Sequence, residues 1–142
     1  MSEEIYDVII VGAGPAGLTA GLYTSRHNNR TLILESKKVG GKGQEAHWVE
    51  NYPGFTSVGG KTLVDIMTSH ALQYVDIYQG EEVLEIKPGD PIEISTTRRK
   101  FFTKTVLLAT GATHRTLGVP GEKQFSGRGV SYCATCDGPL FK

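Results

Sequence analysis

The sequence predicts an α/β fold organised around a parallel β-sheet. Three observations lead to this prediction: an apolar run over residues 5–11, a glycine-rich stretch directly after it, and a second apolar run over residues 31–34. Short β-branched runs of this kind are typical of strands buried on both faces of a parallel sheet. Small residues and spaced leucines between the two runs fit a helix.

The first strand, Ile5 to Val11, leads straight into GAGPAG, residues 12–17. In the helix that follows, Pro15 occupies the first turn, where proline is tolerated because no N–H is needed there. The second strand, Thr31 to Leu34, ends at Glu35.

This order of strand, GxGxxG, helix, strand and acid is a dinucleotide-binding fingerprint. Gly12 allows a tight turn, Gly14 lets a pyrophosphate approach the backbone, and Gly17 lets the helix pack closely on the strand. The helix N-terminus offers free N–H groups and a positive dipole end to the phosphates. Glu35 is placed to accept hydrogen bonds from a ribose diol. The fingerprint does not separate NAD from FAD, and a glycine-rich turn without a ligand is the alternative.

Residues 39–54 are too rich in glycine for a regular element and are expected to form a loop over the ligand or an ordered surface loop. A helix is predicted over Thr62 to Val75, where apolar residues recur at steps of three and four. Thr62 and Asp65 have the spacing of a capping box.

Four short β-type runs follow this helix and predict a small β-meander: residues 76–78, 83–86, 92–95 and 101–103. Residues 105–109 form another buried-strand run, which ends at Thr110-Gly111. A strand ending in Thr-Gly is a second place where the backbone can touch a cofactor at the carboxyl edge of the sheet.

The charge balance argues against highly charged partners, because the chain has 15 Lys and Arg residues and 15 Asp and Glu residues and therefore no formal net charge. Such a chain has no electrostatic reason to bind nucleic acid or an anionic membrane. No apolar run approaches the roughly 20 residues needed to cross a bilayer, and the acidic start is unlike a secretory signal. We therefore expect a cytoplasmic protein.

The only two cysteines, Cys133 and Cys136, have CxxC spacing. In a reducing compartment this spacing favours a catalytic or metal-binding role over a structural staple. A structural zinc site needs four ligands, and His47, His70 and His114 are not spaced as a pair, so no metal site is predicted. A redox pair is favoured over coincidence because the cysteines accompany a nucleotide site.

Four segments together make the sequence resemble the small, bacterial and archaeal type of thioredoxin reductase, a group of flavin-dependent pyridine nucleotide-disulfide oxidoreductases. The segments are GAGPAGLTAGLYTSR, VENYPGF, LLATGA and GRGVSYCATCDG. They occur in the family's order and at about its spacings. The resemblance implies a Rossmann-like FAD-binding fold with a parallel sheet and a small β-meander.

The resemblance also implies a split flavin domain. Residues 1–116 would form the first part of the FAD-binding domain, and residues 117–142 the crossover and the start of the redox-active, nicotinamide-binding domain. The sequence has no second GxGxxG, and no Gly-Asp motif follows the cysteines. The second half of the flavin domain and most of the nicotinamide domain are thus expected to be absent, through truncation or as a separate gene product.

The family's cofactor contacts can be carried over by position. By this resemblance the FAD pyrophosphate would be held by Gly12, Ala13, Gly14, Pro15, Ala16 and Gly17. Glu35 would bind the adenosine ribose, and Val83 would meet the adenine through its backbone. The ribityl and flavin region would be approached by Gly40, Gly41, Lys42 and Asn51, and its other side by Thr110 and Gly111. Many members have glutamine where this chain has Lys42, which would alter the surroundings of the flavin.

The implied reaction passes electrons from NADPH through FAD to a Cys133–Cys136 disulfide, and then to a disulfide of thioredoxin or a similar small protein. Cys136 would face the flavin and Cys133 would attack the protein disulfide. Asp137 would act as the acid–base group, and we expect its pKa to be raised, because its negative charge would oppose the thiolate. The family also implies a homodimer.

Two other functions stay open at this point. One is an FAD-binding or thiol-redox module without NADPH turnover, which needs a partner chain. The other is a relative that takes electrons from ferredoxin or another donor.

Overall fold

The computed structural model describes residues 4–134 and residue 138. The chain forms two compact units, Met1–Gly111 and Ala112–Lys142. The first unit contains the regular helices and strands, and the second is built from turns. Among the described residues, none of the helices has the length and apolar character that a membrane span requires.

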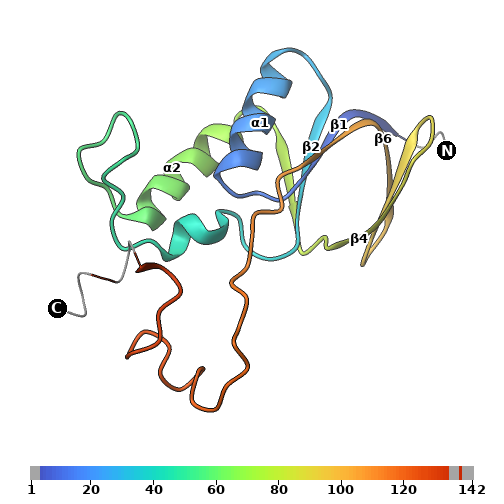
Figure 1. Cartoon of the computed structure of the whole chain (residues 1–142). Helices are drawn as coiled ribbons and strands as arrows, with labels where there is room; N and C mark the ends of the chain where they lie inside the picture. Colours follow the sequence, from blue (N-terminus) through green and yellow to red (C-terminus); the bar gives the residue numbers. More distant parts are fainter. Residues whose placement is uncertain (1–3, 135–137, 139–142) are drawn as a thin grey trace. The chain divides into compact units, whose positions relative to one another are not determined.

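The first unit alternates strands and helices before it ends in an antiparallel ribbon (Figure 1). In chain order the elements are β1 (Ile5–Val11), α1 (Pro15–Arg26), β2 (Thr31–Glu35), the 3-10 helix η1 (Gly41–Glu45), α2 (Gly60–Ala71), β3 (Asp76–Gln79), β4 (Val83–Lys87), β5 (Ile92–Thr96) and β6 (Lys100–Leu108). The predicted α/β class and the first two strands are confirmed.

One six-stranded sheet joins all the strands in the order β3-β2-β1-β6-β5-β4. The four strands β3, β2, β1 and β6 are parallel, and β5 and β4 continue the sheet in antiparallel fashion. Two predictions about strands are therefore wrong. Residues 76–78 belong to the parallel part, as β3, and not to the meander. Residues 101–103 and 105–109 are not separate strands, because β6 pairs with β5 near its start and with β1 along its length.

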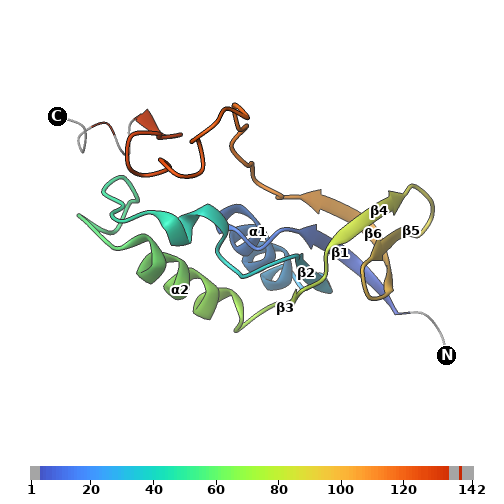
Figure 2. The ribbon, with the colours of Figure 1, turned by 90° about the horizontal axis from the view of Figure 1, so that it is seen from below.

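The period-2 alternation of the parallel strands supplies two cores on opposite faces of the sheet. Ile10 and Ile33 point to the helical face, where they pack with Leu18, Ala71 and Val75. Figure 2 shows α1 and α2 beside the parallel strands, away from the β4–β5 hairpin. On the other face, Ile9, Leu32 and Leu34 pack with Ile94 and Phe101 of the antiparallel ribbon. Each of these isoleucine and leucine side chains stabilises the unit by roughly 1.5–3 kcal/mol through burial.

Helix α2 begins two residues before its predicted start. Gly59 is the N-cap and no side chain caps the helix, so the predicted Thr62–Asp65 capping box is wrong. Asp65 instead lies 2.6 Å from the ammonium of Lys61, one turn away. The helix start packs closely on η1 at Gly60. A Cβ on Gly60 would lie 2.3 Å from the carbonyl oxygen of Gly43, so this position has no room for a side chain.

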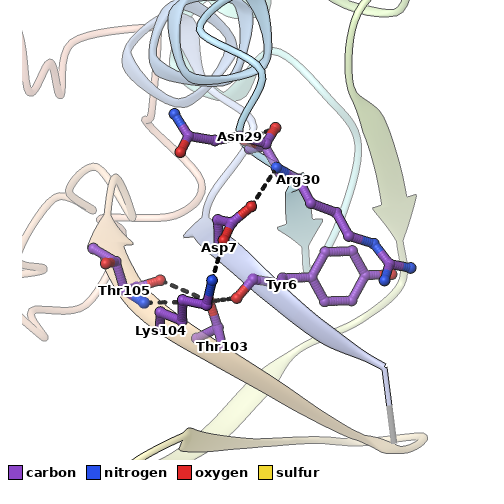
Figure 3. Close-up of polar contacts among 8 residues, drawn as sticks. Tyr6, Asp7, Asn29, Arg30, Thr103, Lys104 and Thr105 are labelled. Carbon is purple, nitrogen blue, oxygen red and sulfur yellow. Dashed lines mark hydrogen bonds and ion pairs between the residues drawn. The ribbon is translucent and has the colours of Figure 1, made fainter. Parts of the chain in front are cut away.

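Asp7 links three strands at the amino end of the parallel sheet (Figure 3). Its carboxylate accepts the backbone N–H of Arg30 at 2.9 Å and lies 2.7 Å from the Lys104 ammonium. These contacts hold the pKa of Asp7 below its usual value, the hydrogen bond from Lys104 being the larger cause, and raise the pKa of Lys104. On the same edge, the Thr103 hydroxyl donates to the carbonyl oxygens of Tyr6 and Thr105.

The second unit is ordered by backbone turns around Phe125. The carbonyl oxygen of Phe125 accepts N–H groups from Arg128 and Val130, and the Gly127 N–H donates to Val130. Glu122 is the one charged side chain buried among the described residues of this unit, at 5% exposure.

Candidate functional site

The turn between β1 and α1 is closely packed at two of its three fingerprint glycines. Gly12 has a φ of +106°, and a Cβ there would lie 2.4 Å from the carbonyl oxygen of Ala109. A Cβ at Gly17 would lie 1.8 Å from the carbonyl oxygen of Gly12. The tight turn predicted at Gly12 and the close helix packing predicted at Gly17 are both present, and neither position has room for a side chain.

Gly14 differs from these two because the space beside it is open. A Cβ at Gly14 would meet no atom within 4 Å. Gly14 is also the N-cap of α1, with no side chain capping the helix and Pro15 in the first turn. The first N–H groups of α1 are therefore available to an anion, which the positive end of the helix dipole would also attract.

Glu35 connects the end of β2 to this turn. Its buried carboxylate accepts the N–H of Ala13 at 2.8 Å through Oε2 and the N–H of Lys37 at 2.8 Å through Oε1. The N–H of Ala13 is thus engaged by Glu35 in this structure. The Ser36 hydroxyl also donates to Oε1, at 3.4 Å. A carboxylate has about four acceptor sites, so Glu35 retains acceptor capacity for a further hydroxyl group.

The loop after β2 packs against the glycine turn. Gly40 donates its N–H to the carbonyl oxygen of Ala13 at 2.8 Å. Gly41 follows with a φ of +53°, and a Cβ there would lie 3.6 Å from the Cα of Gly14. Lys42 is exposed in the first turn of η1. Two glycine-rich segments far apart in the sequence therefore lie against each other.

The end of β6 brings a third segment to the same edge of the sheet. The N–H of Ala109 donates to Val11 at 2.8 Å, and the Cα of Thr110 would lie 3.2 Å from a Cβ on Gly12. Gly111 has a φ of +69° with open space beside it, and both Thr110 and Gly111 are exposed. The carboxyl edge of a parallel sheet is where nucleotide ligands bind in α/β folds.

The start of β4 is fixed to Glu35 by a group that the sequence analysis missed. The N–H of Glu81 donates to the carbonyl oxygen of Glu35 at 3.0 Å, which brings Val83 near the end of β2. The Glu81 side chain is only 1% exposed. It accepts the Thr96 hydroxyl at 2.6 Å and lies 2.8 Å from the Arg99 guanidinium. Local periodicity gives no sign of this cluster, because its partners come from β5 and the turn after it.

Asn51 follows η1 in the chain. It is exposed on the loop that the Val49–Val58 bridge closes, and within residues 4–134 no hydrogen bond joins it to residues 12–17. Its predicted contact with the flavin region stays a prediction.

The CxxC segment, residues 133–136, is described only in part. Cys133 is disulfide-bonded, and its backbone N–H donates to the Ser131 hydroxyl at 3.1 Å. Cys136 and Asp137 lie outside the described residues. Among the described residues, no three His, Cys, Asp or Glu side chains are grouped so that they could hold a metal ion.

The first unit thus brings together the uncapped start of α1, a buried carboxylate and the exposed glycines Gly41 and Gly111. These features fit the adenosine diphosphate half of a dinucleotide. Gly14 has open space beside it, Gly41 lies against Gly14, and the Glu35 carboxylate accepts a hydrogen bond from the same turn.

Comparisons with known proteins agree with this geometry. Residues 6–142 match the family described as pyridine nucleotide-disulphide oxidoreductase. The thioredoxin reductase of Listeria monocytogenes is 49% identical over 141 residues, which cover 99% of this chain and 44% of the relative. The crystal structure of T. acidophilum thioredoxin reductase superposes with a TM-score of 0.83 at 44% identity, over 99% of this chain and 46% of that one.

A ferredoxin-flavin thioredoxin reductase from Clostridium acetobutylicum is also similar, with a TM-score of 0.71 and 34% identity over 99% of this chain and 49% of that one. The chain therefore spans less than half the length of the relatives it matches. With its fold, its glycine-rich turn and a family match over nearly its whole length, the chain belongs to the pyridine nucleotide-disulphide oxidoreductases and is similar to the thioredoxin reductases among them.

Proposed function

We propose that this chain is the part of a thioredoxin-disulfide reductase that holds FAD and carries the redox-active disulfide. The observation that supports it best is the cradle formed by Gly14, Gly41 and Glu35, because open backbone and a buried carboxylate meet there within one compact unit. The first N–H groups of α1 would bind the pyrophosphate, and Glu35 would bind the ribose.

Other residues would hold the remaining parts of the cofactor. The backbone at Val83 would meet the adenine, and Thr110, Gly111, Lys42 and Asn51 would approach the ribityl chain and the flavin. The domain division at 116/117 is part of the same proposal. Residues 117–142 would then lead into a nicotinamide-binding domain.

The chemistry proposed for the cysteines is thiol–disulfide exchange. Bound FAD would supply two electrons from NADPH for opening the Cys133–Cys136 disulfide. The Cys133 thiolate would attack a disulfide of thioredoxin and form a mixed disulfide, releasing one thioredoxin sulfur as a thiolate. Cys136 would then attack Cys133, re-forming the S–S bond of the chain and releasing the second sulfur. Asp137 would carry a proton to one departing sulfur and solvent would protonate the other, so that thioredoxin leaves as a dithiol.

An alternative function is an FAD-binding or thiol-redox module without NADPH turnover, which needs a partner chain. The chain spans less than half the length of its listed relatives, so turnover with NADPH is itself part of the proposal. The similarity to a ferredoxin-flavin thioredoxin reductase makes ferredoxin an alternative donor to NADPH. A cytoplasmic location and a homodimer are further parts of the proposal, supported by the family alone.

One anaerobic experiment separates these functions. The purified chain is loaded with FAD, and the flavin absorbance is followed after NADPH is added. Bleaching supports a complete reductase, and a yellow protein that NADPH does not bleach supports the module or the ferredoxin-linked enzyme. A folded chain that takes up no FAD would contradict the proposal.

A further inference from the structure

The second unit contains a buried carboxylate that the proposed reaction does not use. Glu122 is 5% exposed, whereas most residues around it in the chain are exposed. Its Oε1 accepts the N–H of Leu117 at 2.8 Å and the hydroxyl of Tyr132 at 2.5 Å. Its Oε2 accepts the N–H of Gly118 at 2.7 Å. Hydrogen bonds to an ionised acceptor are about twice as strong as neutral ones, so this carboxylate joins two distant parts of the unit firmly.

Tyr132 is restrained at both its hydroxyl and its ring. While Glu122 accepts the hydroxyl, the ring stacks on His114 with a centroid distance of 5.0 Å and an interplanar angle of 16°. The hydrogen bond raises the pKa of Tyr132 and lowers the pKa of Glu122. Both directions agree with a phenol that donates to a carboxylate.

The segment between Glu122 and Tyr132 forms a turn held by backbone hydrogen bonds. The Phe125 carbonyl oxygen accepts two N–H groups, and Ser126 and Val130 form a bridge. Tyr132 immediately precedes Cys133, whose N–H donates to the Ser131 hydroxyl at 3.1 Å. The contact between Glu122 and Tyr132 therefore restrains the residue that directly precedes Cys133.

We propose that Glu122 and Tyr132 are positioning residues for the redox pair: together they hold the backbone that enters Cys133 in the conformation of the disulfide state. This inference rests on the proposed function, since it assigns a redox role to Cys133 and Cys136. Glu122 and Tyr132 both act by making the closed, disulfide-bonded segment more favourable relative to the open dithiol.

The test measures the dithiol–disulfide equilibrium of the full chain in glutathione buffers without FAD. Reduction opens the S–S bond with two electrons and two protons, while two glutathione thiols become one glutathione disulfide. The two forms are trapped by alkylation and counted by mass. Tyr132→Phe removes only the hydroxyl, and it should shift the equilibrium toward the dithiol by about threefold to tenfold, as expected for the loss of one hydrogen bond.

Tyr23→Phe is the matched control, because Tyr23 is 63% exposed on α1. It should leave the equilibrium unchanged. Glu122→Gln should shift it in the same direction as Tyr132→Phe, and the double variant should shift it no further than the larger single effect, because the two residues act through one contact. Where Glu122→Gln fails to fold, Tyr132→Phe decides the question.

An equilibrium for Tyr132→Phe equal to that of the unaltered chain would overturn the inference. Because the buffers contain no FAD, this result does not depend on whether the chain binds FAD, and the two proposals can fail separately. A chain that binds no FAD but shows the shift would support the positioning role and contradict the reductase proposal. A chain whose cysteines form no disulfide in any buffer would contradict both.

Discussion

The carboxylate of Glu35 accepts a 2.8 Å hydrogen bond from the N–H of Ala13, which lies 22 residues earlier in the chain. This contact ties the end of β2 to the turn between β1 and α1, so that the acid and the start of the helix face the same edge of the sheet. Gly40 completes the arrangement by donating to the carbonyl oxygen of Ala13. The peptide groups on either side of Ala13 thus connect the three parts of the proposed nucleotide site.

Replacing Glu35 should therefore affect both folding and binding. Glu35→Ala leaves the buried N–H of Ala13 without an acceptor, which should lower the free energy of unfolding by about 1–3 kcal/mol. Glu35→Gln keeps one acceptor oxygen and should lower FAD affinity by about tenfold, because the amide NH₂ cannot accept from a ribose hydroxyl. Urea denaturation and FAD fluorescence titration measure the two effects.

Glu50→Gln is the control for these variants, since Glu50 is exposed on the loop between Val49 and Val58. It should leave both quantities unchanged. If Glu35→Gln and the unaltered chain bind FAD with the same affinity, Glu35 is not part of the FAD-binding site.

The fingerprint glycines should separate folding from binding. Gly14 has a φ of −74° and open space around its missing side chain. Gly14→Val should therefore leave the Tm within a few degrees but weaken FAD binding by about a hundredfold or more, because the side chain would occupy the path of the pyrophosphate. Circular dichroism and FAD titration together check this prediction.

Gly17→Ala should behave in the opposite way. The added Cβ would lie 1.8 Å from the carbonyl oxygen of Gly12, so the helix must move and the variant should unfold at a clearly lower temperature. Gly59→Ala is the control, because a Cβ there makes only ordinary contacts, 3.6 Å from the Thr62 hydroxyl. The interpretation fails if Gly14→Val binds FAD as tightly as Gly59→Ala does.

The Asp7–Lys104 pair should make stability depend on pH in the acid range. Because the pKa of Asp7 is lowered in the folded state, its contribution is present above the pKa of an unfolded aspartate, about 3.9. The contribution is lost as the pH falls through the lower folded pKa. Asp7→Asn should lower the Tm by about 1–4 °C near pH 7, and the difference should disappear in strong acid.

Differential scanning calorimetry across this pH range gives the measurement, with Asp76→Asn, at an exposed strand position, as the control. A Tm difference that grows as the pH falls would have the wrong sign for this pair.

The Tyr132 hydroxyl should ionise at a higher pH than that of a free tyrosine. Its hydrogen bond to Glu122 raises its pKa above the ordinary value of 10.0, so the stabilisation is complete below the pKa of the unfolded tyrosine and is lost as the pH rises through the folded pKa. The tyrosinate absorbance of the unaltered chain minus that of Tyr132→Phe isolates this group. Its midpoint should lie above 10 and move down in Glu122→Gln, whereas a midpoint at or below 10 in the unaltered chain would contradict the contact.

The sequence predicted those features that depend on local patterns. Residues 5–11 and 31–35 are β-branched apolar runs and form the expected strands, and the turn at Gly12 has the positive φ that its glycine permits. The start of α2 was misplaced because packing of Gly60 on Gly43, and not a side-chain cap, determines it.

Long-range partners could not be predicted in the same way. The pairing of β3 with β2 and the continuity of β6 depend on which strands meet, which local periodicity does not encode. For the same reason the burial of Glu81 and Glu122 could not be predicted, since the side-chain partners of Glu81 follow 15 or more residues later and Tyr132 follows Glu122 by ten.

The central claim is that the edge of the sheet near Gly14 holds the adenosine diphosphate half of FAD, and amide NMR of the ¹⁵N-labelled chain tests it most directly. Titration with FAD, and separately with ADP, should produce saturable shifts centred on the amides of Gly14, Gly41 and the residues after Glu35, with smaller changes at the amino end of the sheet near Asp7. A folded chain whose amides at these positions do not respond to either ligand would contradict the claim.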